Sequence, residues 1–189
     1  MEKDTTFKEH FFFELQRRDS LNNSLSLLVG IVALLLGGTL TMSKGASLDA
    51  SLSNIFRIVT LLLTTAALAA TVYYMIRSIF GYTYAYFPDT KEMLKTRGEF
   101  ISFYAAQHKC LETAKSAALE DYAAEVEAIY AECTARNGGN NDERAAWAHK
   151  ANRWLVISLV LFAVAGVAYL TNTVGAPDKP VRVLIDNLE

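Results

Sequence analysis

The residue types that most often carry catalysis are sparse in this sequence and form no known catalytic pattern. The 189 residues include three histidines, and none lies in an HExxH pattern or beside a Ser or Cys nucleophile motif. Gly138-Gly139 is read as a helix stop rather than a phosphate cradle. The acidic pair Glu120-Asp121 lies among Lys and Ala residues, which favours a solvated helix face over acid–base catalysis. We therefore expect no enzyme activity and no cofactor.

The two cysteines do not indicate a metal or redox site. Cys110 and Cys133 are not in CxxC spacing and have no histidine cluster nearby. In a cytosolic segment both are expected to be free thiols.

A group of basic side chains could bind the phosphate of a ligand. Its members are Lys91, Lys95, Arg97, His108 and Lys109. Phe103 and Tyr104 are close enough in sequence to offer a surface on which a base could stack. The alternative is a solvated basic face near anionic lipid, and the sequence leaves both interpretations open.

A stripe of small and hydroxyl residues could line a pore. It consists of Arg57, Thr60, Thr64, Ala67 and Thr71, with the threonines and alanine on one face of a helix. Such residues also let membrane helices pack closely, so helix packing is the other interpretation. Pore lining requires several copies of the chain.

Three long apolar runs must position these residues. Ile58 to Ile76 contains no charged residue and is bounded by Arg57 and Arg77, and its length matches the ~30 Å hydrocarbon core of a bilayer. Residues 20–43 and 154–177 are similarly uncharged. We predict an all-α protein with spans at about 24–42, 58–76 and 153–172, the first two forming a hairpin within 21–80. The membrane lipid is therefore an expected partner.

The distribution of Lys and Arg predicts the orientation. Ten lie in residues 77–153, whereas the connector 43–56 holds only Lys44. The positive-inside rule then places the N-terminus and residues 77–153 on the cytoplasmic side of the membrane, and residues 43–56 and the C-terminus on the opposite side.

The remaining segments are expected to be helical or loose. Residues 1–20 predict a helix that either lies at the membrane surface or packs its phenylalanines on another domain or subunit. Residues 81–152 predict a cytosolic module of two to four helices, with breaks at Gly98 and near 116–121 and a stop at 137–140. Asp89 or Thr90 is expected to cap one of these helices. Residues 173–189 form the extracytoplasmic tail.

The layout resembles that of small bacterial membrane effectors of antiphage defence. The features are the N-terminal Glu14-Leu15-Gln16-Arg17-Arg18, the hairpin from Leu25 to Ile76 and the helical segment after it. The chain is similar in this respect to SLATT-type effectors and to the channel subunit of the Hailong system, although the third span departs from the two-span SLATT plan. The resemblance implies a homo-oligomeric channel that a nucleotide or oligonucleotide gates, with a nucleotide-synthesising enzyme as partner. The alternative is a non-conducting membrane anchor or adaptor that presents its helical module to a protein.

Overall fold

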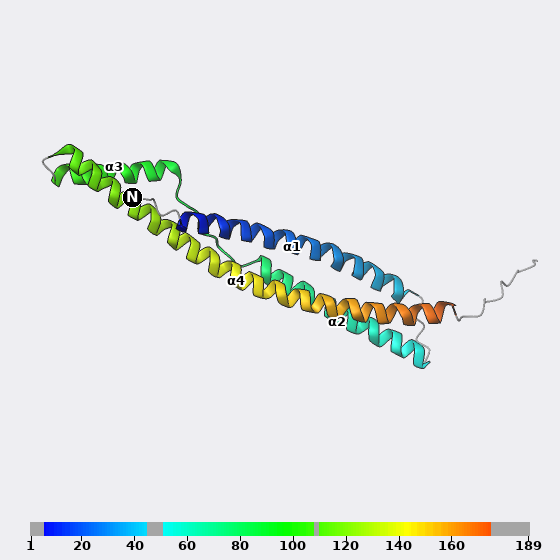
Figure 1. The fold of residues 1–189 in the computed structure, drawn as a ribbon. Helices are drawn as coiled ribbons and strands as arrows, with labels where there is room; N and C mark the ends of the chain where they lie inside the picture. The colour runs from blue at the N-terminus through cyan, green and yellow to red at the C-terminus, as the bar shows by residue number, and fades with distance from the viewer. Residues whose placement is uncertain (1–5, 45–50, 108–109, 175–189) are drawn as a thin grey trace, which may run out of the picture. The chain divides into compact units, whose positions relative to one another are not determined.

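The described residues of the chain are almost entirely helical. The computed structural model describes residues 6–44, 51–107 and 110–174, and within these ranges it contains four helices and no strand (Figure 1). They are α1 (Thr6–Ser43), α2 (Leu52–Ile79), α3 (Thr90–Gln107) and α4 (Leu111–Val174). The predicted all-α class is confirmed, while the predicted tail lies outside the described residues beyond Val174.

Three of the helices are long and apolar enough to cross a membrane. They are α1, α2 and the part of α4 up to Thr171, judged by length and composition. Their outward surfaces carry large apolar side chains, among them Leu34, Leu62 and Val167, each more than 60% exposed. Side chains of this kind are stable when lipid is the solvent.

Local sequence explains where α2 and α3 begin. The backbone N–H of Asn54 donates to Ser51 Oγ at 3.4 Å, and that of Glu92 donates to Asp89 Oδ1 at 2.8 Å. Both are N-cap bonds, which satisfy amide groups that have no partner inside the helix. The expected cap at Asp89 is confirmed.

The expected stop at residues 137–140 is wrong, because α4 runs without interruption from Leu111 to Val174. The expected breaks at Gly98 and near 116–121 are also wrong, since α3 and α4 pass through them. Helix α3 ends at Gln107 and α4 begins at Leu111 instead. Within the supposed stop, Asn137 is buried and bonded to Ala85, and the Asn140 side chain donates to the Thr83 carbonyl. These tertiary contacts outweigh the weak helix propensity of Asn and Gly.

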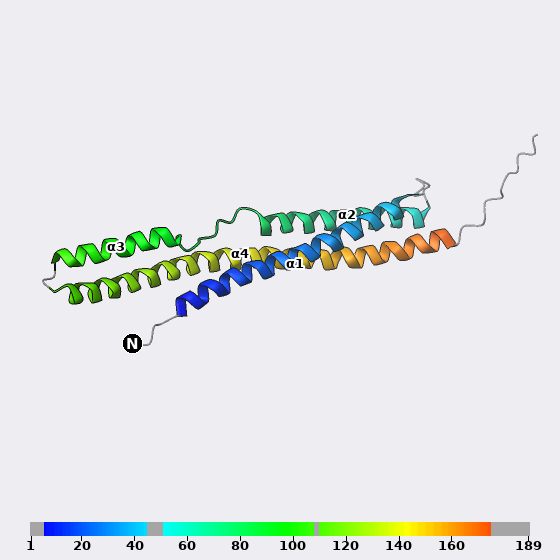
Figure 2. The ribbon, with the colours of Figure 1, turned by 90° about the horizontal axis from the view of Figure 1, so that it is seen from above.

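The chain divides into two compact units. The first contains the residues up to Leu28 together with Tyr73–Ala151. In it, α1 and α4 run in the same direction, because Phe11 contacts Tyr130 and Arg17 contacts Asp142 further along both helices. Figure 2 shows α3 lying along the N-terminal part of α4, and these two helices run in opposite directions and meet where Phe100 contacts Tyr122.

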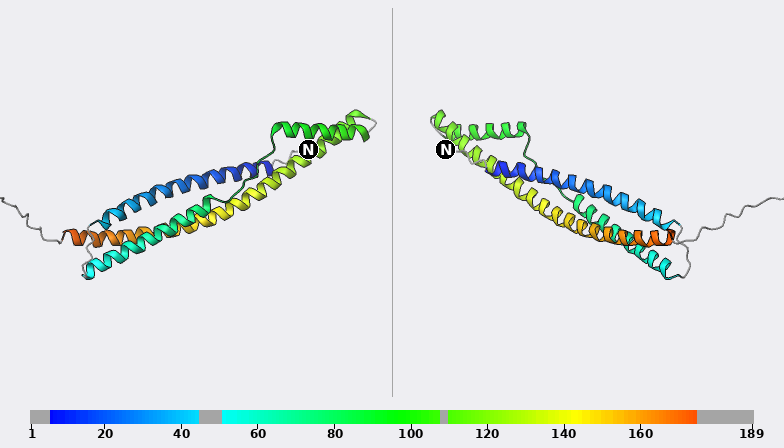
Figure 3. Two further views of the ribbon diagram at one scale, coloured as in Figure 1. Left: turned by 180° about the vertical axis from the view of Figure 1, so that it is seen from behind. Right: turned by 45° about the vertical axis from the view of Figure 1, so that its right-hand side comes forward.

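The second unit consists of Val29–Val72 and the residues from Asn152 onward. It contains apolar parts of α1, α2 and α4, which lie side by side (Figure 3). A Cβ added at Gly38 of α1 would lie only 2.6 Å from the Phe162 ring of α4. Close contact between these helices therefore depends on a residue without a side chain, as is common in membrane helix pairs.

Candidate functional site

Three polar side chains of α4 form the centre of the most elaborate polar site in the described residues. Asn137, Asn141 and Arg144 are spaced at i, i+4 and i+7, so they share one helical face. The two asparagines are 0% exposed and Arg144 is 3% exposed. Burying such groups is costly unless each is hydrogen-bonded, so their partners explain why they are tolerated.

Asn137 and Asn141 hold the segment between α2 and α3 against α4. The Asn137 side chain accepts from the backbone N–H of Ala85 at 2.8 Å and donates to its carbonyl at 2.9 Å. The Asn141 amide donates to the Glu14 carbonyl and to Glu14 Oε2, both at 2.8 Å, and its Oδ1 accepts from the Tyr84 hydroxyl at 2.5 Å. These side chains replace the backbone partners that an irregular segment lacks.

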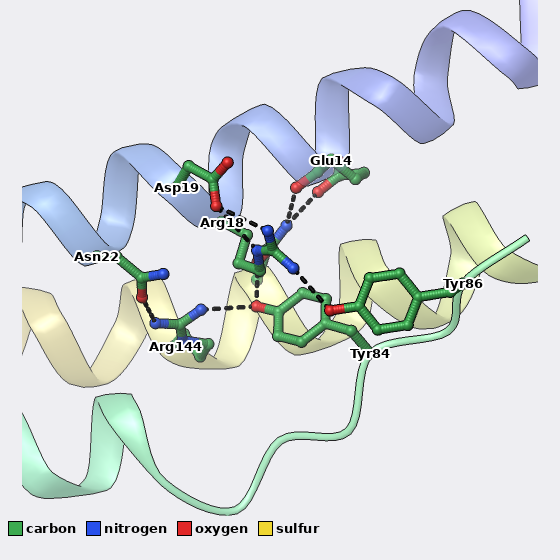
Figure 4. Close-up of polar contacts among 8 residues, drawn as sticks. Glu14, Arg18, Asp19, Asn22, Tyr84, Tyr86 and Arg144 are labelled. Atoms are coloured by element: carbon green, nitrogen blue, oxygen red, sulfur yellow. Dashed lines mark hydrogen bonds and ion pairs between the residues drawn. The ribbon is translucent and has the colours of Figure 1, made fainter.

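Arg144 joins three parts of the first unit (Figure 4). Its Nε donates to the Ser78 carbonyl at 2.8 Å, Nη1 to the Tyr84 hydroxyl at 2.8 Å and Nη2 to Asn22 Oδ1 at 2.6 Å. Ser78 Oγ in turn donates to the Arg144 carbonyl at 2.9 Å. We call Asn22, Ser78, Tyr84, Asn137, Asn141 and Arg144 the polar clamp.

The guanidinium of Arg144 is buried among neutral acceptors. No carboxylate lies within 4.0 Å of it among the described residues. Its charge lies 5.9 Å from the ring centroid of Tyr82 and 5.8 Å from that of Tyr84. Arginine suits this position because its guanidinium is weakly hydrated and directs its donors in a fixed plane.

An exposed row of charges borders the polar clamp. Arg17 pairs with Asp142 at 2.6 Å, and Arg18 pairs with Asp19 at 2.9 Å while donating to the Tyr86 hydroxyl at 2.8 Å. The hydrogen bond to Asp142 raises the pKa of Arg17, and that to Asp19 raises the pKa of Arg18. The nearby Tyr82 has its pKa raised by burial. Both arginines are therefore charged, and the tyrosine is neutral, at neutral pH.

The structure buries the whole predicted pore stripe within one chain. Thr64 and Thr71 are 0% exposed, and Arg57, Thr60 and Ala67 are also buried, all in the second unit. Thr64 Oγ1 donates to the Thr60 carbonyl at 2.7 Å and Thr71 Oγ1 to the Ala67 carbonyl at 2.9 Å. This burial supports the packing interpretation.

The predicted phosphate-binding residues are only partly within the described chain. Lys91, Lys95 and Arg97 lie exposed on α3, and Lys95 Nζ is 3.7 Å from Glu99 Oε1. His108 and Lys109 lie outside the described residues. None of the remaining three is among the lining residues of the cleft between α3 and α4.

Comparison with known proteins gives no relative. No family model, no curated protein and no solved structure matches the chain. The functional reading therefore depends on the geometry alone.

The polar clamp can fix relative position, but it holds no constellation for chemistry. It brings together the end of α2, the segment after it, part of α1 and α4, and every hydrogen-bonding group named above has a partner. Among the described residues, no group of three or more His, Cys, Asp or Glu could hold a metal ion. The i, i+4, i+7 spacing could have revealed the polar clamp in the sequence, but the turn-like composition of residues 137–142 concealed it.

Proposed function

We propose that this protein is a membrane adaptor, in which three spans anchor a helical module that binds a protein partner. The observation that carries this proposal is the burial of the α2 polar stripe inside a single chain. With those side chains turned inward, the spans present an apolar exterior that suits an anchor in lipid. The positive-inside rule favours a cytoplasmic module, and the resemblance to bacterial membrane effectors suggests the bacterial inner membrane.

The polar clamp has a defined part in this proposal. Its hydrogen bonds fix the segment between α2 and α3 to α4, which is itself continuous with the third span. A partner that binds the module would thus act on an element that is rigidly held. Rigid, fully bonded networks of this kind specify one arrangement of the chain.

Site-specific photo-crosslinking in cells tests the adaptor proposal. A benzophenone amino acid at Leu94 of α3, which is 61% exposed, is expected to form a protein adduct. The matched control is Val160 of the third span, which is 59% exposed and is expected to react with lipid only. Absence of any protein adduct from Leu94, under conditions where Val160 reacts with lipid, would contradict the proposal.

A homo-oligomeric channel is the second candidate function. The observation that favours it is that all three spans direct polar side chains inward: Thr39 of α1, Thr64 and Thr71 of α2 and Ser158 of α4 are buried. Movement of the helices would let these groups face water. In this candidate, a nucleotide or oligonucleotide supplied by a partner enzyme binds near Lys91, Lys95 and Arg97, and opening serves antiphage defence.

Voltage-clamped bilayer recordings separate the two candidates. The adaptor is expected to show no current above that of protein-free bilayers. A current that Thr64→Leu changes, while Leu62→Ala on the exposed face does not, would favour the channel. The ligand is tested separately with nucleotide titrations of a Lys91→Glu, Lys95→Glu double variant, whose unchanged affinity would exclude that site.

A further inference from the structure

A cleft between α3 and α4 combines aromatic rings with carboxylates. It has a volume of about 310 Å³ and is lined by Glu99, Phe100, Phe103, Tyr104 and Asp121. This volume is at the lower end of the range for small-molecule sites, roughly 300–1,000 Å³. All five residues belong to the first unit, so the cleft is formed within one compact part of the chain.

The charge of the lining is negative. Glu99 supplies a carboxylate from α3 and Asp121 supplies one from α4, and no basic side chain is among the lining residues. The Tyr104 hydroxyl donates to Asp121 Oδ2, and this hydrogen bond raises the pKa of Tyr104. The phenol is therefore neutral at neutral pH. The Glu99 and Asp121 carboxylates give the lining a negative formal charge, which repels a phosphate.

The rings provide a second, independent attraction for a cation. The rings of Phe103 and Tyr104 are 5.5 Å apart between centroids and nearly perpendicular, at 82°. Phe103 is 58% exposed, so much of its surface is open to a ligand. The face of an aromatic ring carries negative charge density and attracts ammonium groups.

We propose that this cleft binds a small organic cation with an ammonium group, such as a quaternary amine. The aromatic pair contacts the alkylated nitrogen, while Glu99 and Asp121 neutralise its charge. Lys95 already lies 3.7 Å from Glu99, but both side chains are more than 60% exposed, so that pair is weak and does not block the cleft. The inference does not depend on the proposed adaptor function.

Choline is the probe that tests the cleft, with 3,3-dimethyl-1-butanol as its uncharged isostere. The full chain is purified in a maltoside detergent, because phosphocholine detergents and lipids carry the same ammonium group. Calorimetric titration gives affinity, and saturation transfer to the N-methyl protons reports contact. We expect choline to bind at least about tenfold more tightly than the isostere, since carboxylates and rings both favour the charge.

Substitutions locate the binding. Phe103→Leu keeps an apolar side chain without a ring, and Asp121→Asn keeps an acceptor for Tyr104 without the charge. Each is expected to weaken choline binding about threefold to fivefold. Glu132→Gln, at an exposed position about three turns further along α4, is the matched control and should leave affinity unchanged, with helicity by circular dichroism intact in all three.

Three results would overturn the inference. They are absence of choline binding, equal affinity for choline and its isostere, and choline affinity in Asp121→Asn and Phe103→Leu equal to that of the unsubstituted protein. Equal affinity for the isostere would identify the cleft as a purely apolar patch.

Discussion

Arg144 shows how one side chain can hold an irregular segment in place. Its three donor atoms reach the Ser78 carbonyl, the Tyr84 hydroxyl and the Asn22 amide oxygen. Arg144 is 3% exposed and Ser78 is 0% exposed, so water cannot replace the guanidinium at the Ser78 carbonyl. The stability of the first unit should therefore depend on this residue far more than on an exposed arginine.

Arg144→Met is expected to destabilise the protein by about 3 kcal/mol, because it leaves the buried Ser78 carbonyl and the partly buried Tyr84 hydroxyl without their donor. Thermal or denaturant unfolding in detergent measures the change. Arg136→Met, at an exposed position on the same helix, is the control and should shift stability by less than about 0.5 kcal/mol. Equal stability of the two variants would show that the polar clamp does not stabilise the fold.

The two cysteines are both free thiols and are expected to differ in reactivity. Hydrogen bonds from Thr113, the backbone N–H first, lower the pKa of the exposed Cys110, whereas burial raises the pKa of Cys133. Because the thiolate is the nucleophile, Cys110 should react with N-ethylmaleimide at least about tenfold faster at pH 7. Mass spectrometry over time measures both adducts. As pH rises, the rate for Cys110 should level off first; equal rates for the two thiols would contradict the assignment.

At the scale of elements, the sequence was informative about the spans and misleading about the interruptions between them. Uncharged length alone identifies the three helices that are long and apolar enough to cross a membrane, because lipid imposes a simple requirement on any span. Asn137-Gly138-Gly139-Asn140 predicts a stop because local propensity is all that a short window reports. Helix α4 continues there because Asn137 bonds to Ala85 and Asn141 bonds to Glu14, and both partners are more than 50 positions away. Such partners cannot be read from the sequence of one helix.

Substitutions at two glycines are expected to have opposite effects on stability. Gly139 lies inside α4, and a Cβ added there would have no neighbouring side chain within 4 Å. Because alanine favours the helix over glycine, Gly139→Ala should stabilise the protein by about 0.5–1 kcal/mol. Gly81 has a φ of +98°, so Gly81→Ala should destabilise it by about 1–2 kcal/mol. Unfolding midpoints in detergent measure both. A destabilising Gly139→Ala would contradict a regular helical conformation at this position.

At the scale of the whole molecule, helix direction agrees with three crossings. In the first unit, Asn22 and Ser78 both contact Arg144, while Phe11 of α1 lies against Tyr130 and Tyr74 of α2 stacks on Trp147. Thus α1 runs in the same direction as α4, and α2 runs in the opposite direction. A chain that crosses a membrane three times needs this alternation, and the positive-inside rule predicts that residues 77–153, with ten Lys and Arg, lie on the cytoplasmic side.

Cysteine accessibility tests that orientation. Leu52, at the start of α2, is 85% exposed and belongs to the connector side expected to be extracytoplasmic. In a Cys110→Ser background, Leu52→Cys should react with a membrane-impermeant maleimide in intact spheroplasts, because the reagent reaches that side directly. The unsubstituted chain, which retains Cys110 in the module, should react only after the membrane is permeabilised, and buried Cys133 should stay unlabelled in both. The reverse pattern would place the module outside the cell, where a cytoplasmic partner could not reach it, and would remove the basis for the adaptor proposal.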